Sequence, residues 1–170
     1  MDERPFESYP VWIVLGSQAV SLATYGLGTL VLSGFGLAVA LVYLGYCAFV
    51  EVSVLRGSCR HCYYYGKLCA FGRGKTCPLL FKPGEPQRFL GRQPSVRDTL
   101  PDLLVPAIPV VGGIVLLVRD FRWPLLLAVL FIVALATVGT GLVRGLLACP
   151  HCAQRELGCP AEQLFSKQRA

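Results

Sequence analysis

The chain has 170 residues, of which 54% are hydrophobic and only 15% are charged. Soluble domains carry about 25% charged and about 45–50% apolar residues, so this composition excludes an ordinary soluble enzyme of this size. It also excludes a disordered chain, because such chains are poor in aliphatic residues and rich in charge. The composition instead indicates a small integral membrane protein, and the eight cysteines are an unusual addition to it.

Four apolar runs approach or exceed the length of about 20 residues that crosses a bilayer. They form two pairs with short connections, so we expect two helical hairpins. The third run is the shortest, and Pro106 and Pro109 would kink its helix. The predicted fold is therefore an all-α membrane protein with four transmembrane helices, which cover residues 11–32, 35–55, 103–118 and 123–143.

The basic residues are distributed unequally between the two ends of these helices. Of the 16 Lys and Arg residues, only Arg119 and Arg122 fall between the third and fourth helices. Cytoplasmic loops collect Lys and Arg, so both termini and the long cysteine-rich loop are predicted to be cytoplasmic, in the inner or plasma membrane. The net charge of +6 then reflects topology and contact with anionic membrane lipids, and it requires no nucleic-acid partner.

The sequence contains an internal repeat, C-x-H-C-x6-C, which follows each predicted hairpin. Because each repeat includes two helices, both repeats are expected to have the same orientation in the membrane. They would be related by a rotation about an axis along the membrane normal. The connection between them is rich in proline and is expected to lie irregularly along the membrane surface. Repeat 1 covers 1–77, with hairpin 11–55 and cysteine motif 59–77. The connection covers 78–101. Repeat 2 covers 102–170, with hairpin 103–143 and cysteine motif 149–159.

The cysteines of the two motifs are predicted to bind metal. Seven of the eight cysteines lie on the predicted cytoplasmic face, where reducing conditions disfavour disulfides, and paired C-x2-C motifs in such a place more often bind metal. Tetrahedral thiolate sites suit zinc or, as the alternative, an Fe–S cluster. The predicted ligands are Cys59, Cys62, Cys69, Cys149, Cys152 and Cys159, with Cys77, His61 and His151 as possible additions.

Two arrangements of the metal are open. One metal could be shared by Cys59, Cys62, Cys149 and Cys152, or each half could hold its own, completed by Cys77 or a histidine. The doubled C-x2-C-x6-C spacing is similar to that of fungal binuclear zinc-cluster domains, in which six cysteines hold two zinc ions and two sulfurs bridge. This resemblance implies coordination chemistry only, because a transmembrane hairpin separates the halves here and the DNA-reading context is absent.

Three other features have structural interpretations. Tyrosines 63–65, which follow the first motif, are typical of the aromatic belt at a membrane interface. Cys47 is expected to be a small buried hydrophobe within its helix. Gln18 and Glu51 are polar residues within predicted spans, so each is a candidate for a functional role. The alternatives are helix packing for Gln18 and pairing with Arg56 for Glu51.

Two functions follow from these features. The first is a binding or assembly subunit whose cytoplasmic metal-thiolate site binds a protein partner. The alternative is a membrane redox protein that transfers electrons through an Fe–S centre or a dithiol, with quinone as an acceptor. Its four helices and two cysteine motifs are similar to membrane oxidoreductases that pass disulfide electrons to quinone, although in those enzymes the cysteines work on the oxidising side. The sequence contains no hydrolase motif that would support a lipid-modifying enzyme.

Overall fold

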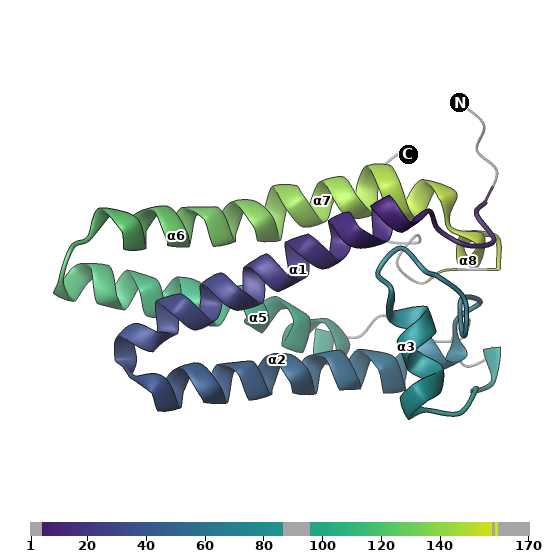
Figure 1. Ribbon diagram of the computed structural model, residues 1–170, viewed down its shortest axis with the longest axis horizontal. Coiled ribbons are helices and arrows are strands. Elements are labelled where there is room, and N and C mark those ends of the chain that lie inside the picture. The colour runs from purple at the N-terminus through teal and green to yellow at the C-terminus, as the bar shows by residue number, and fades with distance from the viewer. Residues whose placement is uncertain (1–4, 87–95, 158, 160–170) are drawn as a thin grey trace. The chain divides into compact units, whose positions relative to one another are not determined.

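The computed structural model describes residues 5–86, 96–157 and 159, and Figure 1 shows its helices. The described part of the chain is all-helical, and its only β pairing is an isolated parallel bridge between Phe6 and Cys152. Four helices are long and apolar enough to cross a membrane, as predicted. They are α1 (Val11–Leu32), α2 (Leu37–Gly57), α5 (Val96–Arg119) and a fourth helix that begins with α6 (Trp123–Ala134).

The apolar side chains of these helices largely point outward. Leu37, Val42 and Val118, for example, are 73%, 74% and 83% exposed. A soluble protein rarely exposes apolar surface on this scale, whereas in a bilayer such side chains contact lipid. The helices also satisfy their own backbone hydrogen bonds, which the hydrocarbon core requires. Exposure and length together support a membrane protein.

The proline-rich connection is more regular than the sequence suggested. Its start belongs to helix α3 (Arg73–Leu80), and its end belongs to α5, which begins seven residues before the predicted start at 103. The expectation of an irregular segment over 78–101 is therefore wrong at both ends, while its middle, 87–95, lies outside the described residues. Pro78 leaves the carbonyl of Gly74 without a helical donor, and the amide of Gly66 donates to this carbonyl instead, at 2.9 Å.

A tyrosine from α2 compensates for a proline inside α5. Pro109 lacks an amide hydrogen, so the carbonyl of Val105, four residues earlier, has no helical donor. The hydroxyl of Tyr43 donates a hydrogen bond to this carbonyl at 2.9 Å. Both groups are buried. Neighbouring side chains that satisfy freed carbonyls in this way allow proline within a transmembrane helix, and the predicted third span is thus a full helix.

The fourth helix changes its winding along its length. After α6 it continues as a π-helical segment (Leu135–Gly139), a short α-helical segment α7 (Thr140–Leu142) and a second π-helical segment (Val143–Ala148). Each π segment has wider turns than an α-helix and rotates everything that follows it. The helix therefore delivers Cys149 in a direction that a regular helix would not.

The described chain divides into two compact units. Unit 2 comprises Ala19–Glu51 and Val96–Gly141, and it is almost entirely helix. Its core joins Leu32, Tyr43, Cys47, Val50 and Val105. Cys47 is only 3% exposed, which confirms the prediction that it is a buried hydrophobe.

Two glycines of unit 2 occupy positions that a residue with a Cβ would not suit, one because of its backbone conformation and one because of a close approach. Gly36 ends the hairpin turn at a φ of 119°, a conformation that residues with a Cβ rarely adopt. Gly113 lies where α5 packs on α6, and a Cβ there would collide with the side chain of Val129. Small residues at such points let transmembrane helices approach one another.

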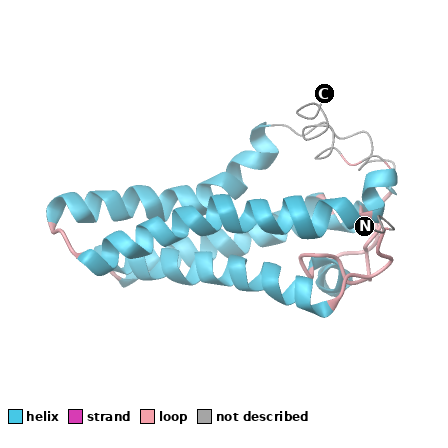
Figure 2. Ribbon diagram, turned by 90° about the horizontal axis from the view of Figure 1, so that it is seen from above, coloured by secondary structure: helices cyan, strands magenta, loops and turns pink. Residues whose placement is uncertain are grey.

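Unit 1 comprises Met1–Gln18, Val52–Ser95 and Leu142–Ala170, and thus contains every cysteine except Cys47. Its loops, drawn in pink in Figure 2, lie among the short helices α3 and α8 (Ala153–Glu156). Each unit draws on both halves of the chain, so the units do not follow the proposed repeats, whose boundaries stay a prediction. The core of unit 1 is formed by Tyr9, Ile13, Val14, Tyr64, Ala70 and Ala148.

Candidate metal centre

The two C-x-H-C segments form turns of the same backbone geometry. Each is a 3₁₀ turn, one over Cys59–His61 and the other over Cys149–His151. In each turn the amide of the second cysteine donates to the carbonyl of the first, at 3.3 Å for both Cys62 and Cys152. Such a turn directs two thiols to the same side. The similarity is local, and the duplication of the whole halves stays a prediction.

The thiols of the first motif lie near one another. Cys59 is within electrostatic range of the thiols of Cys62, Cys69 and Cys77. Cys77 is fully buried, and its thiol faces the carbonyl of Leu55 at 3.7 Å. None of the eight cysteines forms a disulfide. The first half of the chain thus supplies four neighbouring thiols without a contribution from the second half.

Cys62 connects this group to the cysteines of the second motif. Its thiol interacts electrostatically with those of Cys152 and Cys159, and Cys152 in turn interacts with Cys149 and Cys159. All six predicted cysteine ligands and Cys77 thus belong to unit 1, and each lies within electrostatic range of at least one other of these thiols. Among the described residues, however, no three or more His, Cys, Asp or Glu side chains are arranged to hold a metal ion. Metal binding would require the thiols to move closer together.

Burial favours the protonated form of several of these thiols. Burial, together with the neighbouring thiols, raises the pKa of Cys62 to about 11, although a hydrogen bond with the backbone of Tyr64 acts in the opposite direction. Burial also raises the pKa values of Cys77 and Cys152. Reactive cysteines have the opposite property, a lowered pKa. A metal ion that binds these sulfurs would displace their protons, so binding would be pH-dependent.

Cys69 lies at the amino end of helix α3. The amide of Gly74, in the first turn of this helix, donates to the sulfur of Cys69 at 3.2 Å. A donor to this sulfur would help to hold Cys69 in place as a metal ligand. Gly74 is also required for space, because a Cβ there would collide with the backbone carbonyls of Tyr64 and Lys67.

The two histidines, which are equivalent in the sequence, have different surroundings. Nδ1 of His61 lies 3.0 Å from the carbonyl oxygen of Glu85, so this nitrogen already has a backbone partner. The ring of His151 stacks on Phe6, with centroids 4.8 Å apart and planes inclined by 11°. Its Nδ1 is buried and has no hydrogen-bond partner among the described residues. Of the two histidines, His151 is thus the better candidate for a metal ligand.

Tyr64 links the two cysteine motifs. It is 2% exposed, and its hydroxyl donates to the carbonyl of Phe6 at 2.6 Å and accepts from the amide of Ala153 at 3.0 Å. The expectation that all three tyrosines form an interfacial belt is therefore wrong for Tyr64. A second link lies beside it, because the amide of Tyr63 donates to the side-chain oxygen of buried Gln154 at 2.8 Å.

The N-terminal segment completes this arrangement, although its involvement was not expected from the sequence. Phe6 donates its amide to the carbonyl of His151 at 2.9 Å. Tyr9 donates its hydroxyl to the carbonyl of Ala148 at 2.6 Å, and its ring lies 5.4 Å from that of Tyr64. In the sequence, the only indication of this role was the position of Phe6 and Tyr9 shortly before the first apolar run. They fix the second motif against the first.

Polar side chains of α1 hold the loop that carries Cys69. Ser17 donates to the carbonyl of Ala70 at 2.5 Å, and the side-chain nitrogen of Gln18 donates to the carbonyl of Phe71 at 2.6 Å. This gives Gln18 a positioning role. The other polar group of the spans, Glu51, accepts a hydrogen bond from the hydroxyl of Tyr25 at 2.5 Å within unit 2.

No protein-family model, curated protein or solved structure matches this chain. The similarity to binuclear zinc clusters thus stays at the level of cysteine spacing. A function must therefore be inferred from the residues of unit 1 and from their geometry.

Proposed function

We propose that this protein is a membrane-anchored zinc-thiolate module that acts as a binding or assembly subunit, with unit 1 on the cytoplasmic face. The observation that carries the proposal is the presence of seven cysteines, none of them in a disulfide, in one unit, from motifs that lie far apart in the sequence. Zinc would act as a structural ion that joins the two motifs, since thiolate–zinc bonding contributes directly to folding. The resulting rigid surface would bind the partner.

The first zinc would be held by Cys59, Cys62, Cys69 and Cys77. Cys59 and Cys69 each neighbour the other three thiols of this set. A set of four cysteine ligands is common in structural zinc sites. The hydrogen bond from Gly74 to Cys69 supports this set, because partners that donate to the ligands of a metal hold them in place.

The second motif would hold a further ion through Cys149, Cys152 and Cys159. Its fourth ligand would be either the sulfur of Cys62, which is within range of both Cys152 and Cys159, or Nδ1 of His151. A bridging Cys62 would make the site binuclear, as the resemblance in spacing implies. The buried and unpartnered His151 nitrogen would instead complete an independent site. Both versions use all three thiols of the second motif.

The redox alternative has weaker support. A dithiol that exchanges electrons needs a thiolate with a lowered pKa, and burial raises the pKa values of Cys62 and Cys152. An Fe–S centre would use the same thiolates as zinc, so it is tested by the same measurement.

The test is metal analysis of the purified protein together with its absorption spectrum. We expect a colourless protein with bound zinc. Cys59→Ser and Cys149→Ser should each lower the zinc content and the thermal stability. Cys47→Ser is the matched control, because Cys47 is also a buried free thiol but belongs to unit 2. It should leave the zinc content unchanged.

Two further variants distinguish the ligand sets. Cys77→Ser should remove about one zinc per chain if Cys77 completes the first site, and it should have no effect on zinc content if the shared site of Cys59, Cys62, Cys149 and Cys152 is correct. His151→Ala should lower the zinc content only if the second site is independent of Cys62. A brown protein whose colour bleaches on reduction would replace zinc with an Fe–S centre. A protein without metal would refute the proposal.

A further inference from the structure

Helix α3 presents an apolar surface that no described part of unit 1 covers. Its inner face is formed by Gly74 and Cys77, which are both buried. On its outer side Leu79 and Leu80 are 83% and 61% exposed, and the neighbouring Phe81 is half-buried. Two adjacent leucines with this exposure are unusual on a helix that packs against its own protein on the other side.

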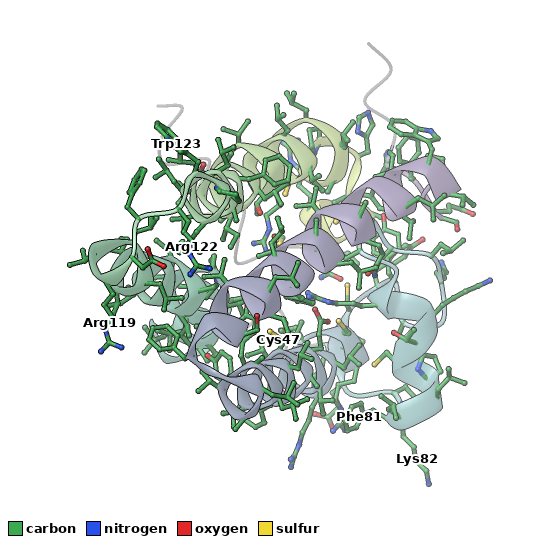
Figure 3. All side chains as sticks on the ribbon, turned by 60° about the vertical axis from the view of Figure 1, so that its left-hand side comes forward. Cys47, Phe81, Lys82, Arg119, Arg122 and Trp123 are labelled. Carbon is green, nitrogen blue, oxygen red and sulfur yellow. The ribbon has the colours of Figure 1, made fainter. Side chains whose placement is uncertain are left out.

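Basic residues flank these leucines. Lys75 lies four residues before Leu79, about one helical turn away on the same side of α3. Lys82 follows the end of the helix, two residues after Leu80, and both lysines are exposed. Figure 3 shows the side chain of Lys82 extending away from the ribbon beyond Phe81. Exposed leucines bordered by lysines can contact both the apolar region and the anionic headgroups of a membrane surface.

The place of α3 along the protein agrees with this pattern. Its buried Cys77 contacts the carbonyl of Leu55, which lies in the last turns of α2, and the hydroxyl of Tyr65 donates to the carbonyl of Phe81 at 2.8 Å. The candidate span that contains α2 ends at His61. Helix α3 thus contacts α2 near the carboxyl end of α2 and near the end of this candidate span, and Figure 1 shows α3 beside the end of α2.

We propose that the outer face of α3, formed by Lys75, Leu79, Leu80 and Lys82, binds the surface of the bilayer through anionic phospholipid headgroups. The leucines would enter the region between headgroups and acyl chains, and the lysines would contact the phosphates. Juxtamembrane lysines are attracted by the negative potential of anionic lipids. This inference does not depend on zinc, and it holds with either ligand set or with none.

The experiment uses the full chain in lipid nanodiscs, with Leu79→Trp as the reporter. Trp12→Phe and Trp123→Phe remove the two native tryptophans. Nanodiscs contain phosphatidylcholine alone or with phosphatidylglycerol, and either lipid can carry bromine at a shallow acyl position. We expect the introduced indole to be quenched by the brominated lipid. In the anionic nanodiscs it should be about threefold less accessible to the neutral quencher acrylamide than in phosphatidylcholine alone.

Lys75→Gln with Lys82→Gln should remove most of the difference between the two lipids. The control is Arg119→Gln with Arg122→Gln, which removes the same charge from the turn between α5 and α6 and should preserve the difference. Equal and high acrylamide access in both lipids, without quenching by bromine, would overturn the proposal. Shielding of the indole in native membranes but not in nanodiscs would also overturn it and would indicate a protein partner on this face. Because Leu79 is so exposed, the reporter variant should fold normally, and its circular dichroism checks this.

Discussion

Unit 1 and unit 2 are held together by different kinds of interaction. In unit 2, helices pack through a small apolar core and through glycines such as Gly113. The hydroxyl of Tyr43 replaces the hydrogen bond that Pro109 removes from α5. Unit 1 contains more loop, and the buried carbonyls of its loops and helix ends each need a donor. Tyr9, Ser17, Gln18 and Tyr64 supply those donors.

The comparison shows what each environment demands. A bilayer favours regular helices because it offers no water to unpaired backbone groups, so unit 2 needs few specific side chains. Unit 1 leaves the helical pattern in order to bring distant thiols together, and it therefore depends on individual hydrogen bonds and, in our proposal, on zinc. Disturbances of single residues should consequently have larger effects in unit 1.

Removal of zinc should produce the largest difference between the units. A chelator that strips the metal should destabilise unit 1 by several kcal/mol, because apparent zinc-binding energies of about 10–16 kcal/mol are coupled to folding in small zinc sites. Unit 2 contains none of the proposed ligands. Hydrogen exchange followed by mass spectrometry should show loss of amide protection in 59–77 and 149–157, with 19–51 unchanged. Equal loss in both units would contradict the division.

Substitution of glycine should have the next largest effect. Gly74→Ala places a methyl group against the backbone carbonyls of Tyr64 and Lys67, which cannot move independently, and should cost about 3 kcal/mol of stability. Gly113→Ala in unit 2 meets the side chain of Val129, which can change its rotamer, and should cost about 1 kcal/mol. Thermal unfolding in detergent measures both. A larger loss of stability from Gly113→Ala than from Gly74→Ala would contradict the expectation that unit 1 is the more sensitive unit.

Alkaline pH should weaken the metal-free protein through Cys62. The pKa of this thiol is raised from its ordinary value of 9.0 to about 11 in the folded protein. Its stabilising contribution is therefore complete below pH 9 and is lost as the pH rises toward 11, by about 2 kcal/mol. Unfolding followed by the fluorescence of Trp12 should show this loss.

Two controls identify the group responsible for the alkaline effect. Cys62→Ala should reduce the slope of the pH dependence between 9 and 11, and the remaining slope belongs to other buried thiols such as Cys77 and Cys152. Zinc-loaded protein should also lack this contribution, because the thiol has already given up its proton to bind the metal. An unchanged slope in Cys62→Ala would assign the effect to another group.

The smallest effect is expected from loss of the hydrogen bond between Tyr43 and the carbonyl of Val105 in α5. Tyr43→Phe removes the hydroxyl that donates to Val105 and should cost about 1 kcal/mol, since hydrogen bonds between transmembrane helices contribute modestly. Pro109→Ala restores an amide donor four residues after Val105. In that background Tyr43→Phe should therefore cost less, and a double-mutant cycle measured by unfolding in detergent gives the difference. Equal costs in both backgrounds would show that the bond does not compensate for Pro109.

The sequence by itself determined the number and class of the helices. Apolar runs long enough to cross a bilayer must form helices there, because the backbone has no other way to satisfy its hydrogen bonds, and α1 begins and ends where its run predicts. It also singled out the cysteines of two repeated motifs, since the spacing of C-x-H-C is local information. The same locality limited it for α5, where the prolines argued for a short span and Tyr43, a residue far away in the chain, explains how the helix continues past Pro109.

Only the tertiary structure decided how the motifs meet. The π-helical segments before Cys149 reset its direction, and periodicity in the sequence cannot reveal such a change in winding. The burial of Tyr64, the involvement of Phe6 and the different surroundings of His61 and His151 likewise depend on contacts between residues that are 24 to 145 positions apart. Such contacts follow from the packing of the whole chain, because each one forms only when several segments already lie in place.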